Sequence, residues 1–380
     1  MSISRRNMLR TLGAGAVANV AFPAFASSWI PELSKAPNAK PPAGPIRLNR
    51  NENAYGASPL AIAALREGLN DIYRYPELGD ALQEKLANLH NVKPNQVVLG
   101  CGSTEILRMS ADTFLKPGKK LVIAKPTFPF LESYAKDKGM EIQTVPLTPN
   151  HEHDLKAMLA ASDGSTGLVY ICNPNNPTGT LTPRQELEAF IQKLPAGIPV
   201  LVDEAYHHYA GGTSSYVSFL DRAMNDGRVF VARTFSKVYG LAGLRVGYAI
   251  APPDITQQLM RNRLGMGVSL LSLKAALTAL DDAEHVRLSI KRNADDRQEF
   301  FNDSNVRMGA WIDSRTNFIL LKADHPPEEI TQHFRKNNIL IGYNLTLGQN
   351  KYVRISLGQP EEMKEFWRVW DLLPHSGMNH

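Results

Sequence analysis

The chain has 380 residues, of which 43% are hydrophobic and 21% are charged, and its formal net charge is +5. This composition excludes a disordered protein and suggests a large core in two or three domains. Three of the arginines, Arg5, Arg6 and Arg10, lie close together at the N-terminus. Without these three arginines the formal net charge falls from +5 to +2, so no nucleic-acid partner is expected.

Residues 1–26 have the order of a twin-arginine export signal. The pair Arg5 and Arg6 precedes small and apolar residues at 12–22, and the segment ends on Ala-Phe-Ala, which resembles a cleavage site. We therefore expect a periplasmic mature chain that begins at Ser27, with a cytoplasmic protein as the alternative. No later apolar run approaches the roughly 18 residues needed to cross a bilayer, so no membrane association is expected after cleavage.

Residues 27–45 are rich in Pro, Ala and Lys, which favours a linker or N-terminal arm. From residue 46, short and continuously apolar runs alternate with helical patterns. Such runs are typical of strands that are covered on both faces. We expect an α/β fold in which a large domain, residues 46–265, has a mostly parallel sheet between two helical layers. The strands are expected at 97–99, 121–123, 168–171, 200–202, 229–232 and 246–250, and helices at 81–91 and 184–193.

After about residue 252 the pattern changes, and it indicates a smaller α+β domain. We assign residues 266–380 to an inter-domain helix and this C-terminal domain. The elements expected are a long helical stretch at 256–301 whose part from 281 links the domains, strands at 318–321 and 352–357, and a helix at 328–337.

The first two strand-end loops carry polar groups suited to an anionic cofactor. GCGSTE, residues 100–105, opens a helix in which Gly102 permits close backbone approach and Ser103 and Thr104 suit a phosphate. The same letters also suit an ordinary helix N-cap. NPNNPTG, which follows the strand at 168–171, is a rigid turn that would hold Asn176 at a set angle.

The next two loops add a carboxylate and a lysine. In DEAY, Asp203 and Tyr206 leave a strand end together, and a buried carboxylate needs a cation such as a pyridinium nitrogen. In TFSKVYGLAGLRVG, Lys237 is flanked by hydroxyls and followed by Arg245. A lysine desolvated beside a cationic cofactor can lose its proton and act as a nucleophile. Taken alone, this lysine would be read as a surface residue.

The segments NENAYG, GCGSTE, NPNNPTG, DEAY, SKVYGLAGLRVG and YVRISLG together resemble the fold-type I pyridoxal-phosphate (PLP) aminotransferases of the aspartate aminotransferase superfamily. The resemblance is closest to the histidinol-phosphate aminotransferase branch and covers the chain from about residue 46 to its end. It implies a bound pyridoxal 5'-phosphate, small-molecule amino acid and 2-oxo acid substrates, and a homodimer.

The resemblance also implies the role of each matching residue. Lys237 would carry the cofactor as a Schiff base and move the α-proton of the substrate. Asp203 would pair with the pyridine nitrogen, and Tyr206 and Asn176 would bind the 3-oxygen of the ring. The phosphate would be held by Gly102, Ser103, Thr104, Thr234, Ser236 and Arg245.

Three further positions match residues that contact cofactor or substrate in the family. Phe128, in KPTFPF, would stack on the cofactor ring. Arg354 would bind the α-carboxylate of the substrate, with Asn176 beside it, because a guanidinium suits bidentate binding. Tyr55 would reach from the second subunit to the cofactor and substrate. No metal is expected.

One position departs from the branch and bears on the substrate. The strand before the Arg354 segment carries an arginine for the substrate phosphate in histidinol-phosphate aminotransferases, and NILIGYN places Gly342 there, followed by Tyr343. Histidinol phosphate is therefore not expected as a substrate, and the export signal argues the same way. The amino donor stays open.

The sequence is also compatible with functions other than transamination. The cofactor site does not decide which α-carbon bond breaks, so a PLP-dependent lyase or decarboxylase is the alternative, although Arg354 favours transamination. A cofactor-sensing transcription regulator would need a helix-turn-helix, which residues 1–45 lack. An inactive protein is disfavoured by the complete set of cofactor positions.

The chain has two cysteines, Cys101 and Cys172, too few for a disulfide framework. Both are expected as small buried residues, although a periplasm permits one bridge between them.

Overall fold

The computed structural model describes residues 44–211, 216–307 and 309–373, and from Gly44 onward the chain forms one compact unit. The expected export signal and nearly all of the expected arm lie outside the described residues. Among the described helices, none is both long and apolar enough to cross a membrane.

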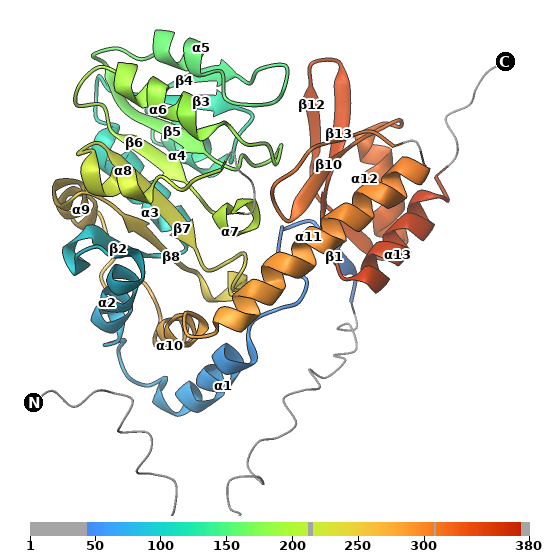
Figure 1. The fold of residues 1–380 in the computed structure, drawn as a ribbon, viewed down its shortest axis with the longest axis horizontal. Coiled ribbons are helices and arrows are strands. Elements are labelled where there is room, and N and C mark those ends of the chain that lie inside the picture. Colours follow the sequence, from blue (N-terminus) through green and yellow to red (C-terminus); the bar gives the residue numbers. More distant parts are fainter. Residues whose placement is uncertain (1–43, 212–215, 308, 374–380) are drawn as a thin grey trace, which may run out of the picture. The chain divides into compact units, whose positions relative to one another are not determined.

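A seven-stranded sheet with the order β2-β8-β7-β6-β5-β3-β4 lies at the centre of the N-terminal part of this unit (Figure 1). The strands from β7 to β4 are parallel to their neighbours, whereas β8 runs antiparallel to β7 and β2. The expected α/β fold with a mostly parallel sheet is therefore confirmed. The strands are β2 (Val97–Cys101), β3 (Lys120–Lys125), β4 (Glu141–Pro146), β5 (Thr166–Cys172), β6 (Val200–Asp203), β7 (Val229–Thr234) and β8 (Val246–Ile250).

Alternate residues of each central strand enter two hydrophobic clusters, one on each face of the sheet. In β5, Val169 and Ile171 belong to one cluster, and Leu168 and Tyr170 belong to the other. Neither face meets water, which explains the continuously apolar runs in the sequence. The first cluster includes residues of α2 (Gly79–His90), α5 (Leu155–Ala160), α6 (Arg184–Lys193) and α10 (Leu270–Ala279), and the second includes residues of α3 (Ser103–Phe114), α4 (Phe130–Asp137) and α9 (Pro253–Met260).

Strand β4 was not expected from the sequence. It lies at the edge of the sheet, pairs with β3 alone, and buries only Val145 fully. An edge strand that faces water on most of its length lacks a continuous apolar run, so the pattern used for the other strands misses it.

The C-terminal part of the unit holds a four-stranded antiparallel sheet with the order β12-β13-β10-β9. Three helices pack with it around a third hydrophobic cluster, to which Phe300, Phe334 and Phe366 belong. The expected strands at 318–321 and 352–357 correspond to β10 and β13. The elements are α11 (Ala283–Val306), β9 (Trp311–Ile312), β10 (Phe318–Lys322), α12 (Pro327–Lys336), β12 (Asn344–Leu347), β13 (Asn350–Ser356) and α13 (Pro360–Trp370).

Strand β1 (Ile46–Leu48) pairs in parallel with β11 (Ile339–Ile341), and Leu48 is part of the third hydrophobic cluster. The expected boundaries assign residue 46 to the larger domain, whereas this pairing joins β1 to the C-terminal region. The pairing brings together distant parts of the chain, which periodicity cannot reveal. The boundary expected at residue 265 stays a prediction.

The helical stretch expected at 256–301 consists of three separate helices, α9, α10 and α11, and its expected part from 281 corresponds to α11. Gly265 and Gly267 lie in the first break, where their backbone freedom disfavours a helix. The side chains of Ser269 and Asp282 cap the next two helices by accepting from the amides of Ser272 and His285. The remaining helices are α1 (Pro59–Gly68), α7 (His207–Ala210) and α8 (Leu220–Asn225).

The ends of five strands meet at one edge of the central sheet. Cys172 at the end of β5 is in register with Asp203 at the end of β6. Gly247, at the start of β8, is in register with Gly100 of β2 and with Thr234 of β7. The loops that follow β2, β5, β6 and β7 therefore converge on one place, where ligands bind in open α/β sheets.

Candidate active site

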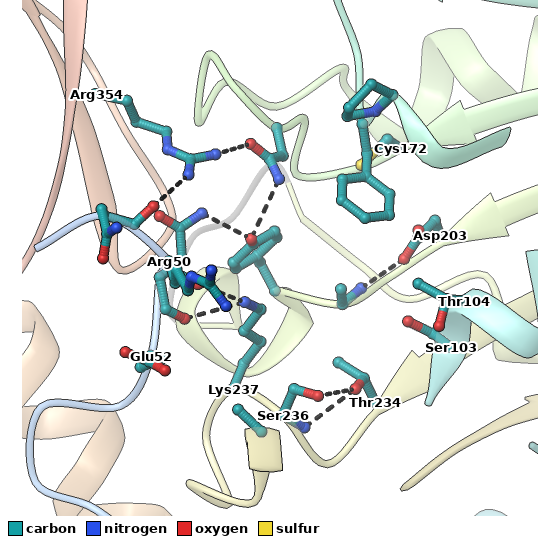
Figure 2. Close-up of a pocket in the computed structure, with 18 of the residues that line it drawn as sticks. Arg50, Glu52, Ser103, Thr104, Cys172, Asp203, Thr234, Ser236, Lys237 and Arg354 are labelled. Atoms are coloured by element: carbon teal, nitrogen blue, oxygen red, sulfur yellow. Dashed lines mark hydrogen bonds between the residues drawn. The ribbon is translucent and has the colours of Figure 1, made fainter. Parts of the chain in front are cut away.

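A cavity of about 710 Å³ lies at this edge (Figure 2). Its volume suits a cofactor together with a small substrate. Phe128 contributes an aromatic ring to the wall. The cavity brings together most of the residues predicted from the sequence: Ser103, Thr104, Phe128, Asn176, Asp203, Tyr206, Thr234, Ser236, Lys237, Arg245 and Arg354.

The amine of Lys237 is held at the cavity by backbone carbonyl groups. Its Nζ donates to the carbonyl oxygens of Asn51 at 3.0 Å and Arg50 at 3.4 Å. Burial, and to a smaller extent the positive charge of Arg354, lowers the pKa of Lys237 to about 8. Near neutral pH the neutral amine, which is the nucleophilic form, is therefore more populated than in an ordinary lysine.

Asp203 is a buried carboxylate with hydrogen bonds from neutral groups. Its oxygens accept from the Tyr170 hydroxyl at 2.9 Å and from the Ala205 amide at 3.1 Å. Burial raises the pKa of Asp203 to about 6. Within the described parts of the chain no cationic side chain forms an ion pair with it. A carboxylate of this kind on a cavity wall fits a protonated pyridine nitrogen.

Hydroxyl groups and a guanidinium gather at the start of α3 and beyond the end of β7. Arg245 donates to Thr104 Oγ1 and to Ser236 Oγ, both at 3.3 Å, and Thr234 Oγ1 donates to Ser236 Oγ at 2.9 Å. Ser103 is the first residue of α3, so helix amide groups face the same place. All these groups can donate and none is a carboxylate, which fits the phosphate of the expected cofactor.

Gly102 supports this phosphate site without lining the cavity. Its φ is +74°, in the left-handed region that favours glycine, and it precedes the first residue of α3. A Cβ at this position would overlap the guanidinium of Arg245. Gly102 therefore acts by leaving space for Arg245.

Tyr206, Asn176 and Asn51 form a hydrogen-bonded group above Lys237. The Tyr206 hydroxyl accepts from Asn51 Nδ2 at 3.0 Å and from Asn176 Nδ2 at 3.4 Å. The Lys237 amine lies 5.4 Å from the centre of the Tyr206 ring. Burial raises the pKa of Tyr206, so its hydroxyl keeps its proton and can donate to an oxygen in the cavity.

Arg354, on β13, reaches the cavity from the C-terminal sheet. It donates from Nη1 to Asn176 Oδ1 at 2.8 Å and from Nη2 to the carbonyl oxygen of Asn49 at 2.9 Å. The ring centre of Tyr343 lies 4.4 Å from its guanidinium carbon. Its buried Nε has no hydrogen-bond partner among the described residues. Each Nη has two N–H groups and makes one of these bonds, so donors of the guanidinium remain for an anion in the cavity.

Tyr55 does not line the cavity. Its hydroxyl donates to both carboxylate oxygens of Asp296 on α11, each at 3.0 Å, and the guanidinium of Arg292 lies over its ring. In this chain the residue therefore ties the NENAYG segment to α11. Its role in the site of a second subunit stays a prediction.

Half of the cavity residues were not assigned from the sequence, among them Arg47, Arg50, Asn51, Glu52 and Tyr343. Asn51 and Glu52 belong to the NENAYG motif, so the motif itself was a usable signal. Arg47 and Arg50 precede it, and Tyr343 follows Gly342. Sequence patterns give no reason to bring a segment before α1 into a site made by strand ends.

Both cysteines are free thiols, and Cys172 is buried at the cavity wall while Cys101 is partly exposed. Burial raises the pKa of the Cys172 thiol. The thiol is therefore protonated, and Cys172 is the small buried residue that was expected, whereas the same expectation for Cys101 is wrong.

The model of the family described as aminotransferase class I and II matches residues 43–369. The chain belongs to this family. Histidinol-phosphate aminotransferase 2 of Carboxydothermus hydrogenoformans is 35% identical, over 84% of this chain and 88% of that protein. Histidinol-phosphate aminotransferase of Moorella thermoacetica is 36% identical, over 85% and 84%. The solved structure of histidinol-phosphate aminotransferase from Sinorhizobium meliloti in complex with pyridoxal-5'-phosphate has a TM-score of 0.80 and 26% identity, over 86% and 92%.

This aminotransferase is thus a fold-type I enzyme of the histidinol-phosphate aminotransferase-like branch that depends on PLP. The cofactor supplies an aldehyde carbon that takes up the amino group and a ring that accepts electrons from the α-carbon of the substrate. The described residues fit it at three points: Lys237 at the aldehyde, Asp203 at the ring nitrogen, and the group around Arg245 at the phosphate.

Proposed function

We propose that the enzyme moves the amino group between an L-amino acid and a 2-oxo acid, and that Arg354 binds the α-carboxylate of both. The observation that carries this proposal is the guanidinium of Arg354, which lines the cavity and donates from Nη1 and Nη2 to one protein acceptor each. Each Nη has a second N–H group. A carboxylate in the cavity would accept from these two groups in bidentate geometry.

Lys237 is the base in this proposal. With the cofactor bound, its Nζ would remove the proton from the α-carbon of the substrate and hold it for return. In the cofactor-free protein, burial lowers the pKa of this amine, which favours the neutral form that a base requires. The two carbonyl groups accept hydrogen bonds from Nζ and cannot take its proton, so they orient the amine without changing its protonation.

We further propose that histidinol phosphate is a poor substrate, although the relatives above carry its name. Gly342 stands where the branch usually has an arginine for the phosphate. The Gly342 amide donates to the Arg354 carbonyl oxygen at 2.8 Å, and a Cβ on Gly342 would lie 2.5 Å from that same oxygen. A side chain at this position would therefore disturb Arg354, and the arginine that the branch usually offers the phosphate from this strand is absent.

A screen of amino donors tests this function. The cofactor-loaded enzyme is mixed with single amino acids or with histidinol phosphate, without a 2-oxo acid, and loss of the visible cofactor band is followed. We expect conversion to the pyridoxamine form with at least one L-amino acid, and only slow conversion with histidinol phosphate. Release of CO2 or ammonia in place of a 2-oxo acid would favour the decarboxylase or lyase alternative. Fast conversion of histidinol phosphate would contradict the proposed substrate class.

We propose that the active form is a homodimer. Support comes from apolar side chains that are exposed in succession beyond α1: Leu69, Ile72, Tyr73 and Tyr75 are each more than half exposed. Contiguous apolar exposure of this kind is typical of interfaces between subunits.

We propose that the chain is exported by the twin-arginine route and cleaved near Ala26. Support comes from Arg5 and Arg6 ahead of the apolar stretch. No predicted site residue lies before Ser27. Replacing both arginines with lysine should therefore leave active enzyme in the cytoplasm, as cell fractionation would reveal. An unaltered chain found in the cytoplasm with Met1 intact would contradict this location.

A further inference from the structure

The arginines that line the cavity differ in what they contact. Arg245 belongs to the phosphate group, and Arg354 binds Asn176 and the carbonyl oxygen of Asn49. Arg47 forms an ion pair with Glu52, with 3.0 Å between Nη2 and Oε1. In the part of the chain that the structure describes, no ion pair or hydrogen bond is made by the guanidinium of Arg50, which is exposed and lines the cavity. Its charge is therefore left for a ligand.

Arg50 lies between the two residues that handle the α-carbon. Arg354 Nη2 donates to the carbonyl oxygen of Asn49, and Lys237 Nζ donates to those of Arg50 and Asn51. Figure 2 shows this contact between Arg50 and Lys237. Three consecutive residues thus join the carboxylate site to the proton-transfer site, and the side chain of the middle one enters the same cavity.

The substituents of the substrate's α-carbon can be assigned to these groups. Under the proposed function its carboxylate goes to Arg354 and its hydrogen faces Lys237, which leaves the side chain. With the cofactor phosphate at Arg245 and the ring nitrogen at Asp203, the positive charge that remains without a counter-charge is that of Arg50. An anionic group on the substrate side chain would pair with it.

We infer that Arg50 determines specificity by binding an anionic group at the far end of the substrate side chain. This inference rests on the proposed transamination of α-amino acids. The anionic group that Arg50 would bind is a carboxylate or a phosphate monoester, because either accepts two hydrogen bonds from a guanidinium. A neutral side chain of the same size leaves Arg50 unpaired, and an imidazole offers it no anion.

Glutamate and glutamine form the sharpest pair of substrates, because they differ at the far end of the side chain in charge and hardly in size. We expect kcat/KM to be higher for glutamate. Arg50→Gln should lower the glutamate-to-glutamine ratio by about 10- to 100-fold, mainly through KM for glutamate. Arg47→Gln is the matched control, because Arg47 lines the same cavity but already forms an ion pair with Glu52. In this variant the glutamate-to-glutamine ratio of kcat/KM should change by less than about threefold.

Binding of substrate analogues gives a readout that does not depend on turnover. Calorimetry should find that glutarate binds the cofactor-loaded enzyme more tightly than butanoate does, and that Arg50→Gln removes most of this difference. Melting temperature and cofactor content are measured on each variant to establish that it is folded. Comparing aspartate with O-phosphoserine then tells which anion is preferred, and a preference for either one over asparagine supports the inference.

An equal ratio in Arg50→Gln and wild type would overturn the role of Arg50, as would a wild type that uses glutamine as well as glutamate. The proposed function can fail separately. If no amino acid converts the cofactor, the function is wrong, and the glutarate comparison alone then decides whether Arg50 binds a distal anion.

Discussion

At the scale of single residues, the two key ionisable groups are both shifted toward their neutral forms. Burial raises the pKa of Asp203 to about 6 and lowers that of Lys237 to about 8. These shifts describe the protein alone. Each is suited to a cofactor that brings a positive ring nitrogen to the carboxylate and an aldehyde to the amine, so the site is prepared for a ligand with these two features.

Replacing Lys237 with Ala should abolish the covalent attachment of the cofactor. The amine is the group held at the cavity by two carbonyl oxygens, and alanine has no nucleophile. Borohydride treatment followed by mass spectrometry should find cofactor on Lys237 in wild type and none in the variant. Lys125→Ala, which removes a surface lysine paired with Glu132, is the control and should keep the label. Labelling of another lysine in the Lys237 variant would mean that the nucleophile is elsewhere.

Asp203 should make the cofactor-free protein less stable as the pH rises. Its folded pKa of about 6 lies above the usual value of 3.8, so between these values the native state binds the extra proton. The stabilisation is therefore present at low pH and is lost as the pH rises toward 6 and above, by roughly 3 kcal/mol in total. Urea unfolding of wild type and Asp203→Asn at pH 4 to 7 should reveal this slope in wild type and a weaker one in the variant.

Addition of PLP should reverse that trend, because a protonated ring nitrogen stabilises the charged carboxylate. Asp203→Asn should also lose most of its turnover, since the neutral amide does not keep the ring protonated. Equal slopes in the two proteins, or wild-type turnover in the variant, would argue against this role for Asp203.

At the scale of elements, the start of α3 depends on space as well as on hydrogen bonds. Gly102→Ala should weaken cofactor binding by at least about tenfold, because a Cβ there displaces the guanidinium of Arg245 from the phosphate site. Cofactor dissociation can be followed by fluorescence during titration of the cofactor-free protein.

Gly118→Ala provides the matched control for this experiment. Gly118 has φ of +79°, close to the +74° of Gly102, but a Cβ on it would have nothing within 4 Å. Both variants place an alanine at positive φ, so both should lose stability from backbone strain. Only Gly102→Ala should lose cofactor affinity. Equal affinity in both variants would mean that the steric contact with Arg245 has no effect on the phosphate.

At the scale of the whole molecule, the proposed homodimer depends on the apolar side chains beyond α1. Ile72→Glu should shift the protein toward a monomer, since it places a charge in an apolar interface. Light scattering should give twice the mass of one mature chain for wild type. Val306→Glu is the control, because Val306 at the end of α11 is 82% exposed and should tolerate a charge without a change in assembly. A wild-type monomer that binds PLP tightly would contradict the dimer.

The sequence by itself determined the central sheet and the residues at its strand ends. Runs such as 168–171 and 229–232 are apolar at every position because both faces of the sheet are covered, and this leaves a clear signal. Parallel strands bring their carboxyl ends to one edge, so the loops that carry Asp203 and Lys237 had to meet. The types of those residues then indicated the cofactor.

Only the tertiary structure decided which distant segments complete the site. The pairing of β1 with β11 carries Asn49 and Arg50 to the cavity, and Tyr55 away from it to Asp296. Arg354 enters from a separate sheet, where Gly342 packs against its backbone. The pairing of β1 with β11 and the bond from Arg354 to Asn49 join positions about 300 residues apart, and no local period or motif in the sequence encodes them.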